Sequence, residues 1–113
     1  MRGNNEKHSG KDDYAKEKLF VAMLCLISEG PLRIRLADAA ESSLSRLMLA
    51  HFSNDEHLKA WQRIMDDLTW APKDSIDDGR VRATIRSMLD EDVQKVAEEI
   101  LSLYHKLLGG WRD

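Results

Sequence analysis

Residues 19–27 form an unbroken apolar run, Leu-Phe-Val-Ala-Met-Leu-Cys-Leu-Ile. On an α-helix, where successive residues turn by about 100°, these side chains point in every direction around the axis. A helix that is apolar on all sides needs cover on all sides. In a chain of 113 residues that cover must come from several other helices, from a second copy of the chain or from a partner. The run therefore constrains burial and association rather than chemistry.

Length and composition favour one soluble helical domain. The chain is 42% hydrophobic and 33% charged, it contains two prolines, and strong helix formers dominate it. We expect a polar arm over residues 1–11 and a single domain over residues 12–113. The net charge of −3 argues against a general nucleic-acid coat, which needs a basic excess. Cys25 is the only cysteine, so no disulfide can form within the chain, and we expect an inert, buried thiol.

The apolar run does not indicate a membrane span or a signal peptide. Nine residues are too few to cross a bilayer. Lys16 and Lys18 precede the run, but Asp12, Asp13 and Glu17 lie among them, and no small-residue cleavage site follows. We therefore expect a cytoplasmic protein without a targeting segment.

Helix periodicity and end signals predict the elements. We expect helices over residues 12–30, 31–52, 55–70, 80–88 and 90–108, with a loop over 71–79. The sequence thus predicts an all-α fold, an antiparallel bundle of four main helices plus one short helix.

Within these helices the pattern predicts which residues face inward. Leu19, Phe20, Met23, Leu26 and Ile27 form the expected core stripe of the first helix. The small residues Ala39, Ala40 and Ser43 should let that helix approach the second closely. Ser53 and Glu56 have the spacing of a capping box for the third, and Leu101 and Leu108 are expected to widen the core face of the last.

Several apolar residues fall outside the main stripes and become candidate interface residues. A lone copy would struggle to cover all of them, and aromatic residues near element ends often anchor protein contacts. The set comprises Tyr14, Val21, Cys25, Ile34, Met48, Phe52, Trp70 and Trp111.

Arginines form a second candidate set, an anion-binding or acidic-partner face of Arg33, Arg35, Arg80, Arg82 and Arg86. Arg33 and Arg35 lie at the start of a helix, where positive charge opposes the helix dipole and needs compensation elsewhere. One interpretation is a face for nucleic acid or another anion. The other is ion pairing with acids of the third or last helix, since the arginine fork holds carboxylates bidentately.

Catalytic and metal-binding patterns are weak. His51 and His57 are six residues apart across a helix break, unlike the i, i+4 spacing of helical metal ligands. The acids of residues 74–79 fail the calcium-loop pattern, no serine lies in a glycine-flanked elbow, and Cys25 has no evident histidine partner. A helix-turn-helix over residues 32–48 is disfavoured because no strong turn residue interrupts it. We expect no enzyme activity, no metal and no cofactor.

These observations favour a small, non-enzymatic helical protein–protein interaction module. We expect it to form a homodimer or to join a hetero-complex with another protein. The alternative is a nucleic-acid-binding accessory protein that uses the arginine-rich face, which requires those arginines to lie exposed without carboxylates nearby.

Overall fold

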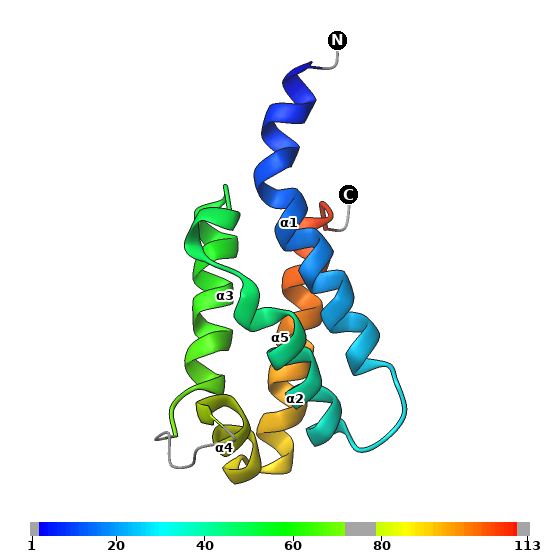
Figure 1. Ribbon diagram of the computed structural model, residues 1–113, viewed down its shortest axis with the longest axis vertical. Helices are drawn as coiled ribbons and strands as arrows, with labels where there is room; N and C mark the ends of the chain where they lie inside the picture. The colour runs from blue at the N-terminus through cyan, green and yellow to red at the C-terminus, as the bar shows by residue number, and fades with distance from the viewer. Residues whose placement is uncertain (1–2, 72–78, 111–113) are drawn as a thin grey trace.

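The chain is all-helical in the computed structural model, which describes the backbone of residues 3–71 and 79–110 and the side chains from residue 12 onward within those ranges. Within these ranges it contains five α-helices, two short 3₁₀ turns and no strand (Figure 1). The elements are α1 (Gly3–Leu26), α2 (Leu32–Ser42), η1 (Leu44–Arg46), η2 (Leu49–His51), α3 (Asp55–Leu68), α4 (Gly79–Ser87) and α5 (Asp90–Leu107). The expected all-α class is confirmed.

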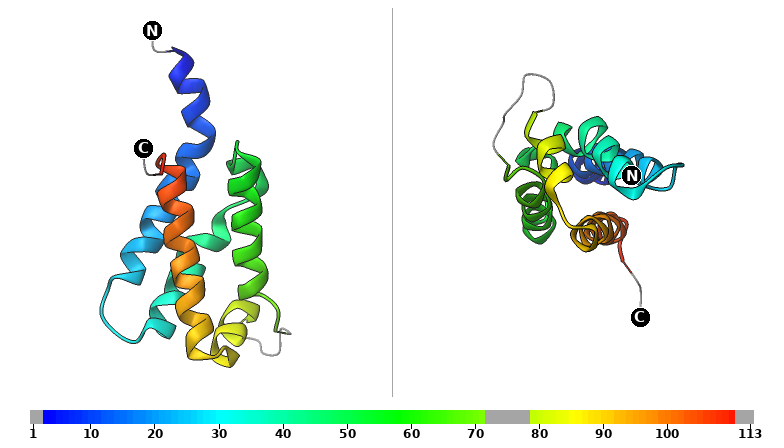
Figure 2. Two further views of the ribbon diagram at one scale, coloured as in Figure 1. Left: turned by 180° about the vertical axis from the view of Figure 1, so that it is seen from behind. Right: turned by 90° about the horizontal axis from the view of Figure 1, so that it is seen from below.

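The helices pack in a compact body of 51 × 30 × 23 Å. α1 contacts α2 and α5, while α3 contacts α5 and α4. The short α4 lies at the end of the molecule away from the N-terminus, and the first turns of α1 extend beyond the other helices (Figures 1 and 2). The predicted contact between the first two helices is confirmed, and Ala39 and Ala40 of α2 are fully buried.

α1 differs from the prediction in both extent and orientation. It begins at Gly3 rather than near Asp12, so residues 3–11 continue the helix, and it ends at Leu26 rather than at Gly30. Its buried stripe is Ala15, Leu19, Ala22 and Leu26. The expectation that Phe20 and Ile27 face inward is wrong, because the helix turns its small alanines toward its neighbours and so lets them approach closely.

The predicted helix over residues 31–52 is also wrong in extent. It ends at Ser42, and two 3₁₀ turns follow. The hydroxyls of Ser42, Ser43 and Ser45 donate to the carbonyls of Asp38, Ala39 and Glu41 at 2.6, 2.9 and 3.3 Å. Such back-bonding weakens and bends a helix, and here it accumulates over four residues.

The break after α2 does not create a helix-turn-helix. It is followed by single 3₁₀ turns rather than a second α-helix, although residues 39–45 lack a strong turn signal. The segment instead sends Leu44, Leu47 and Phe52 into the core. The carbonyl of Leu44 accepts from the amide of Leu47 at 3.2 Å and also from the indole Nε1 of Trp61 at 3.4 Å, which links this segment to α3.

The cap of α3 is Asn54, not Ser53 as the capping-box spacing predicts. The Asn54 side chain accepts from the amides of Glu56 and His57 at 2.7 and 3.1 Å. Ser53 is occupied elsewhere, because both its amide and its hydroxyl donate to the carboxylate of Asp12 on α1. Asp12 therefore ties α1 to the start of α3.

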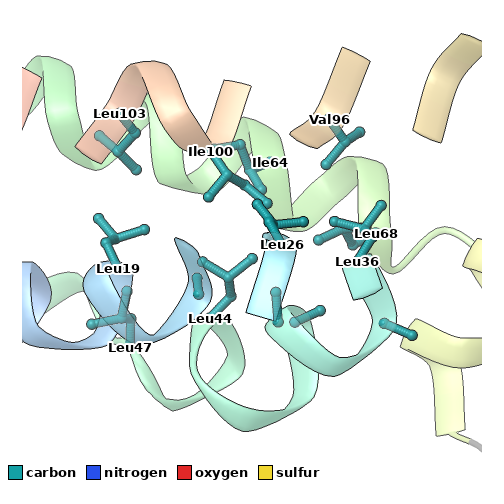
Figure 3. Close-up of a cluster of buried hydrophobic side chains, with 14 of the residues drawn as sticks. Leu19, Leu26, Leu36, Leu44, Leu47, Ile64, Leu68, Val96, Ile100 and Leu103 are labelled. Atoms are coloured by element: carbon teal, nitrogen blue, oxygen red, sulfur yellow. The ribbon is translucent and has the colours of Figure 1, made fainter. Parts of the chain in front are cut away.

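The core joins side chains from α1, α2, η1, α3 and α5 (Figure 3). Its labelled members are Leu19, Leu26, Leu36, Leu44, Leu47, Ile64, Leu68, Val96, Ile100 and Leu103. α4 and α5 begin and end within one or two residues of the prediction. Leu101 and Leu108, however, do not widen the core face of α5: each lies one position, about 100°, beyond the buried Ile100 and Leu107, and is more than half exposed.

Candidate interaction surfaces

The predicted interface residues are scattered over several parts of the molecule. Ile34, Met48 and Trp70 are exposed, whereas Phe52 is buried with its ring 5.7 Å from that of Trp61. Trp111 lies outside the described residues. Phe52 therefore needs no cover from a second chain, and the set does not form one surface.

Three further members of that set are partly covered within the chain. Tyr14 packs its ring 4.4 Å from that of His51, and the sulfur of Cys25 lies 3.5 Å from the hydroxyl of Ser42. Val21 is likewise half-buried. This flank of α1 is the one turned toward the segment 42–51, so much of its apolar surface is already used.

A second group of exposed apolar side chains, which the sequence did not predict as an interface, lies along α1 and α5. On α1, Phe20, Leu24 and Ile27 are 50%, 48% and 72% exposed, and their spacing of four and three residues places them on one helix face. Leu101 of α5 is 51% exposed, and Leu108, the C-cap residue of α5, is 58% exposed.

Tyr104 joins the two rows, because it lies between Leu101 and Leu108 on the α5 face and its ring is 6.5 Å from that of Phe20. We call these six residues the α1–α5 apolar face: Phe20, Leu24, Ile27, Leu101, Tyr104 and Leu108. Sequence reasoning missed it by assigning Phe20 and Ile27 to the core. The available signal was the pair of small residues Ala15 and Ala22 in the stripe with Leu19 and Leu26, which places Phe20, Leu24 and Ile27 on the opposite side of the helix.

Polar side chains border this face. Asp13, Lys16 and Glu17 precede its α1 row, and Gln94 and Glu98 lie on α5, joined by a hydrogen bond of 3.0 Å. Charges of both signs therefore surround an apolar centre, the usual anatomy of a protein interface.

The arginines at the start of α2 donate hydrogen bonds to backbone carbonyls outside this helix. Nη1 of Arg33 donates to the carbonyls of Ile85 and Met88 at 2.5 and 2.7 Å, and Nη2 pairs with Asp90 at 2.5 Å. Arg35 donates to the carbonyls of Gly30 and Leu26. Each arginine thus meets carbonyls at the end of another helix, where positive charge is favourable, and this compensates its unfavourable place at the start of α2.

Arg82 of α4 is held by two acids of α2. It contacts Glu41 at 2.8 and 2.9 Å and Asp38 at 3.5 Å. The hydrogen bond to Glu41 is the main reason that the pKa of Arg82 is raised above its usual value. Arg80 and Arg86 are exposed. The arginine set is therefore not a bare basic surface, and the contact of Arg33 with an α5 acid counts against the nucleic-acid alternative.

A hollow of about 220 Å³ lies between α2 and α4. Its apolar floor is Ile34, Ala37 and Ile85, and the arginines that line it are Arg33, Arg82 and Arg86. A second hollow, of about 280 Å³, lies beside the exposed Trp70 and Leu89, with Met88 and Val96 among its lining residues.

The described side chains include no group of three or more histidine, cysteine, aspartate or glutamate residues arranged to hold a metal ion. His51 has a structural use: its Nδ1 accepts from the amide of Met48 at 3.0 Å and its ring rests on Tyr14. The predicted acidic loop falls mainly on residues 72–78, outside the described ranges. None of the described helices has the length and apolar character needed to span a bilayer.

Comparison with known protein families, curated proteins and solved structures finds no match to this chain.

Proposed function

We propose that this protein is a small, non-enzymatic, cytoplasmic interaction module that forms a homodimer through the α1–α5 apolar face. The proposal includes the antiparallel bundle as the scaffold that presents the face. It is carried by one observation: five large apolar side chains of two contacting helices are about half exposed or more, and the ring contact of Phe20 with Tyr104 joins their two rows.

The size of the face supports association. Its exposed side chains offer on the order of 500 Å², near the upper end of what a monomer normally leaves in water. A standard interface buries about 800 Å² on each partner, so a dimer formed through this face would bury part of its polar border as well.

A second copy of the chain is a suitable partner for this face. A two-fold dimer uses the same patch on both subunits, so the patch is buried on each and the assembly does not grow further. Apolar rows of two helices can pack on the identical rows of a partner, as in a four-helix layer. The border carries Asp13, Lys16 and Glu17, so both signs of charge are present to pair across the axis.

The polar groups support a non-enzymatic role. The hydroxyls of Ser42, Ser43 and Ser45 donate to backbone carbonyls, and His51 accepts from a backbone amide. These contacts use groups with catalytic potential to shape the fold.

The decisive experiment is sedimentation velocity over a dilution series. Wild type is expected to sediment as a dimer that dissociates on dilution, and Phe20→Glu as a monomer at every concentration. The matched control is Leu49→Glu, which places the same charge on a similarly exposed residue of η2, outside the face. A wild-type monomer at high concentration, or equal dissociation of both variants, would overturn the proposal. A monomer would leave the face to a different protein partner.

A further inference from the structure

The hollow beside Trp70, which we call the Trp70 hollow, lies where the end of α3, the connection from α4 to α5 and the first turns of α5 meet. α3 contributes Asp67 to its lining, and α5 contributes Asp92, Lys95 and Val96. Its volume of about 280 Å³ exceeds the roughly 150 Å³ of a cavity that accepts benzene, so one long side chain fits. The Trp70 hollow shares no residue with the α1–α5 apolar face.

Two large apolar side chains lie exposed at this hollow. Trp70 and Leu89 are 57% and 62% exposed, while Met88 and Val96 of the same lining are buried. Leu89 is the N-cap residue of α5, a position that favours Ser, Thr, Asn or Asp, and its side chain makes no cap bond. Both exposed side chains are therefore available to an apolar group of another molecule, and tryptophan is a frequent anchor of such contacts.

The charge at the Trp70 hollow is negative and unpaired. Among its described lining residues, Asp67 and Asp92 carry two negative charges and Lys95 carries the one positive charge. No ion pair joins these three groups to one another or to any other described residue. The α2–α4 hollow differs, because Arg33 and Arg82 there already meet acids of the chain. The Trp70 hollow thus keeps its attraction for a cation.

Asp67 is also unfavourable for its own helix. It lies with Asp66 in the last turn of α3, which contains no base, and the carbonyls at a helix C-terminus already carry partial negative charge. At the start of α2, the comparable misplaced charge of Arg33 gains contacts with carbonyls elsewhere in the chain. Asp67 gains no such contact within the part of the chain that the structure describes. A cation from another molecule would supply this compensation.

We infer that the Trp70 hollow binds a basic amphipathic peptide segment of a partner protein, in which arginines lie next to a leucine or a similar apolar residue. One guanidinium stacks on the Trp70 indole and pairs with the Asp67 carboxylate, because its planar fork can do both. The apolar side chain covers Leu89 and the buried side chains beneath it. A second basic residue, one helical turn away, meets Asp92.

Other occupants match these features less well. Nucleic acid would bring its phosphates toward the carboxylates of Asp67 and Asp92, and a small cation would leave Leu89 in water. A second copy of this chain would make a contact distinct from the two-fold face. Such a contact would join one dimer to the next and produce species larger than a dimer.

The test is fluorescence anisotropy at about 150 mM salt, where long-range attraction between an acidic chain and a basic probe is screened. The probe is a labelled helical peptide with arginines and leucines on one face. The protein carries Phe20→Lys throughout, which repels the probe from the α1–α5 apolar face. Trp70→Ala and Asp67→Lys are each expected to weaken binding about tenfold or more. The matched control is Glu56→Lys, which reverses an exposed acid at the other end of α3 and should change affinity less than about twofold.

Two further measurements separate binding from folding and from simple charge. Asp67→Lys removes a misplaced charge, so urea denaturation should find it at least as stable as the parent protein although it binds the peptide more weakly. A peptide with citrulline in place of arginine keeps the shape without the charge, and it should bind about tenfold more weakly or worse.

No binding by the parent protein, equal losses in Asp67→Lys and Glu56→Lys, or equal binding of the citrulline peptide would overturn the inference. A labelled single-stranded oligonucleotide whose binding Trp70→Ala abolishes would also overturn it. So would a wild-type species larger than a dimer that Trp70→Ala abolishes, because it would assign the hollow to a second copy.

Discussion

The α1–α5 apolar face and the α2–α4 hollow expose apolar side chains in two different electrostatic settings. On the first, Phe20, Leu24 and Ile27 stand together with charges only at the border. In the second, Ile34 lies among arginines that neighbouring acids hold in place. An apolar surface without charges is stabilised by almost any matching apolar surface, including its own copy. An apolar surface set among ion pairs accepts only a partner whose polar groups match the positions of those charges.

The same contrast occurs within α1 alone. Leu19 is fully buried and Leu24 is 48% exposed, although both are leucines of one helix. Leu19 therefore contributes to the stability of the monomer, whereas the side chain of Leu24 is available to a partner.

The largest expected effect sharpens this contrast. Leu19→Ala should lower the free energy of unfolding by about 2–5 kcal/mol, because it removes a buried side chain and leaves a cavity. Leu24→Ala should change the stability of the monomer by less than about 0.5 kcal/mol and weaken self-association instead. Urea denaturation in a Phe20→Glu background measures the monomer, and sedimentation measures the dimer. If Leu19→Ala and Leu24→Ala lowered the free energy of unfolding of the monomer by similar amounts, the proposed difference between the two positions would be wrong.

A smaller effect is expected at Arg33, whose contacts join α2 to α4 and α5. Arg33→Ala should cost about 1.5–3 kcal/mol, because the carbonyls of Ile85 and Met88 lose a charged donor. Chemical denaturation provides the measurement. Asp90→Asn removes only the exposed ion pair with Arg33 and leaves the carbonyl contacts in place, so it should lower the free energy of unfolding by less than about 0.5 kcal/mol. If the two variants were equally destabilised, the ion pair rather than the carbonyl contacts would be the important link.

The smallest effect concerns the link between α1 and the start of α3. Burial raises the pKa of Asp12, but the hydrogen bonds from Ser53, with smaller contributions from Lys16 and His57, outweigh it and leave this pKa below its usual value. A lowered pKa in the folded state means that the stabilisation is complete above the unfolded value of about 4 and is lost as the pH falls through the folded value.

Asp12→Asn should therefore lower the melting temperature slightly near neutral pH, and the difference from wild type should vanish under acidic conditions below about pH 4. Thermal melts across this range provide the measurement. A difference that persisted unchanged into acid would show that Asp12 acts through packing rather than charge.

Sequence reasoning worked best where local signals and burial agree. α5 begins at the acids Asp90, Glu91 and Asp92 and buries residues spaced three and four apart, so its extent and most of its inner face could be read directly. Its buried Leu103 belongs to the same periodicity. The sequence also indicates that the positive charge of Arg33 at a helix start needs compensation. It does not reveal the two carbonyls that provide it, because they lie 52 and 55 residues away in the chain.

The failures share a cause, which is competition between local signals of similar strength. Ser53 and Asn54 are both good caps, and the choice fell to Asn54 because Asp12, 41 residues away, occupies Ser53. At the end of α2, the hydroxyls of Ser42, Ser43 and Ser45 all donate to the carbonyls four residues earlier, and together these bonds favour the end of the helix. Each outcome depends on contacts that periodicity alone does not contain.

By itself the sequence determined that this chain is helical and that its first helix carries more apolar surface than one side can bury, because composition and local periodicity set those properties. Which side of that helix faces inward was decided only in the tertiary structure. A helix that is apolar all round gains similar transfer energy in several orientations, so close packing of Ala15 and Ala22 against neighbouring helices selects one of them. That choice leaves Phe20, Leu24 and Ile27 in water, and with them the surface on which the proposed association depends.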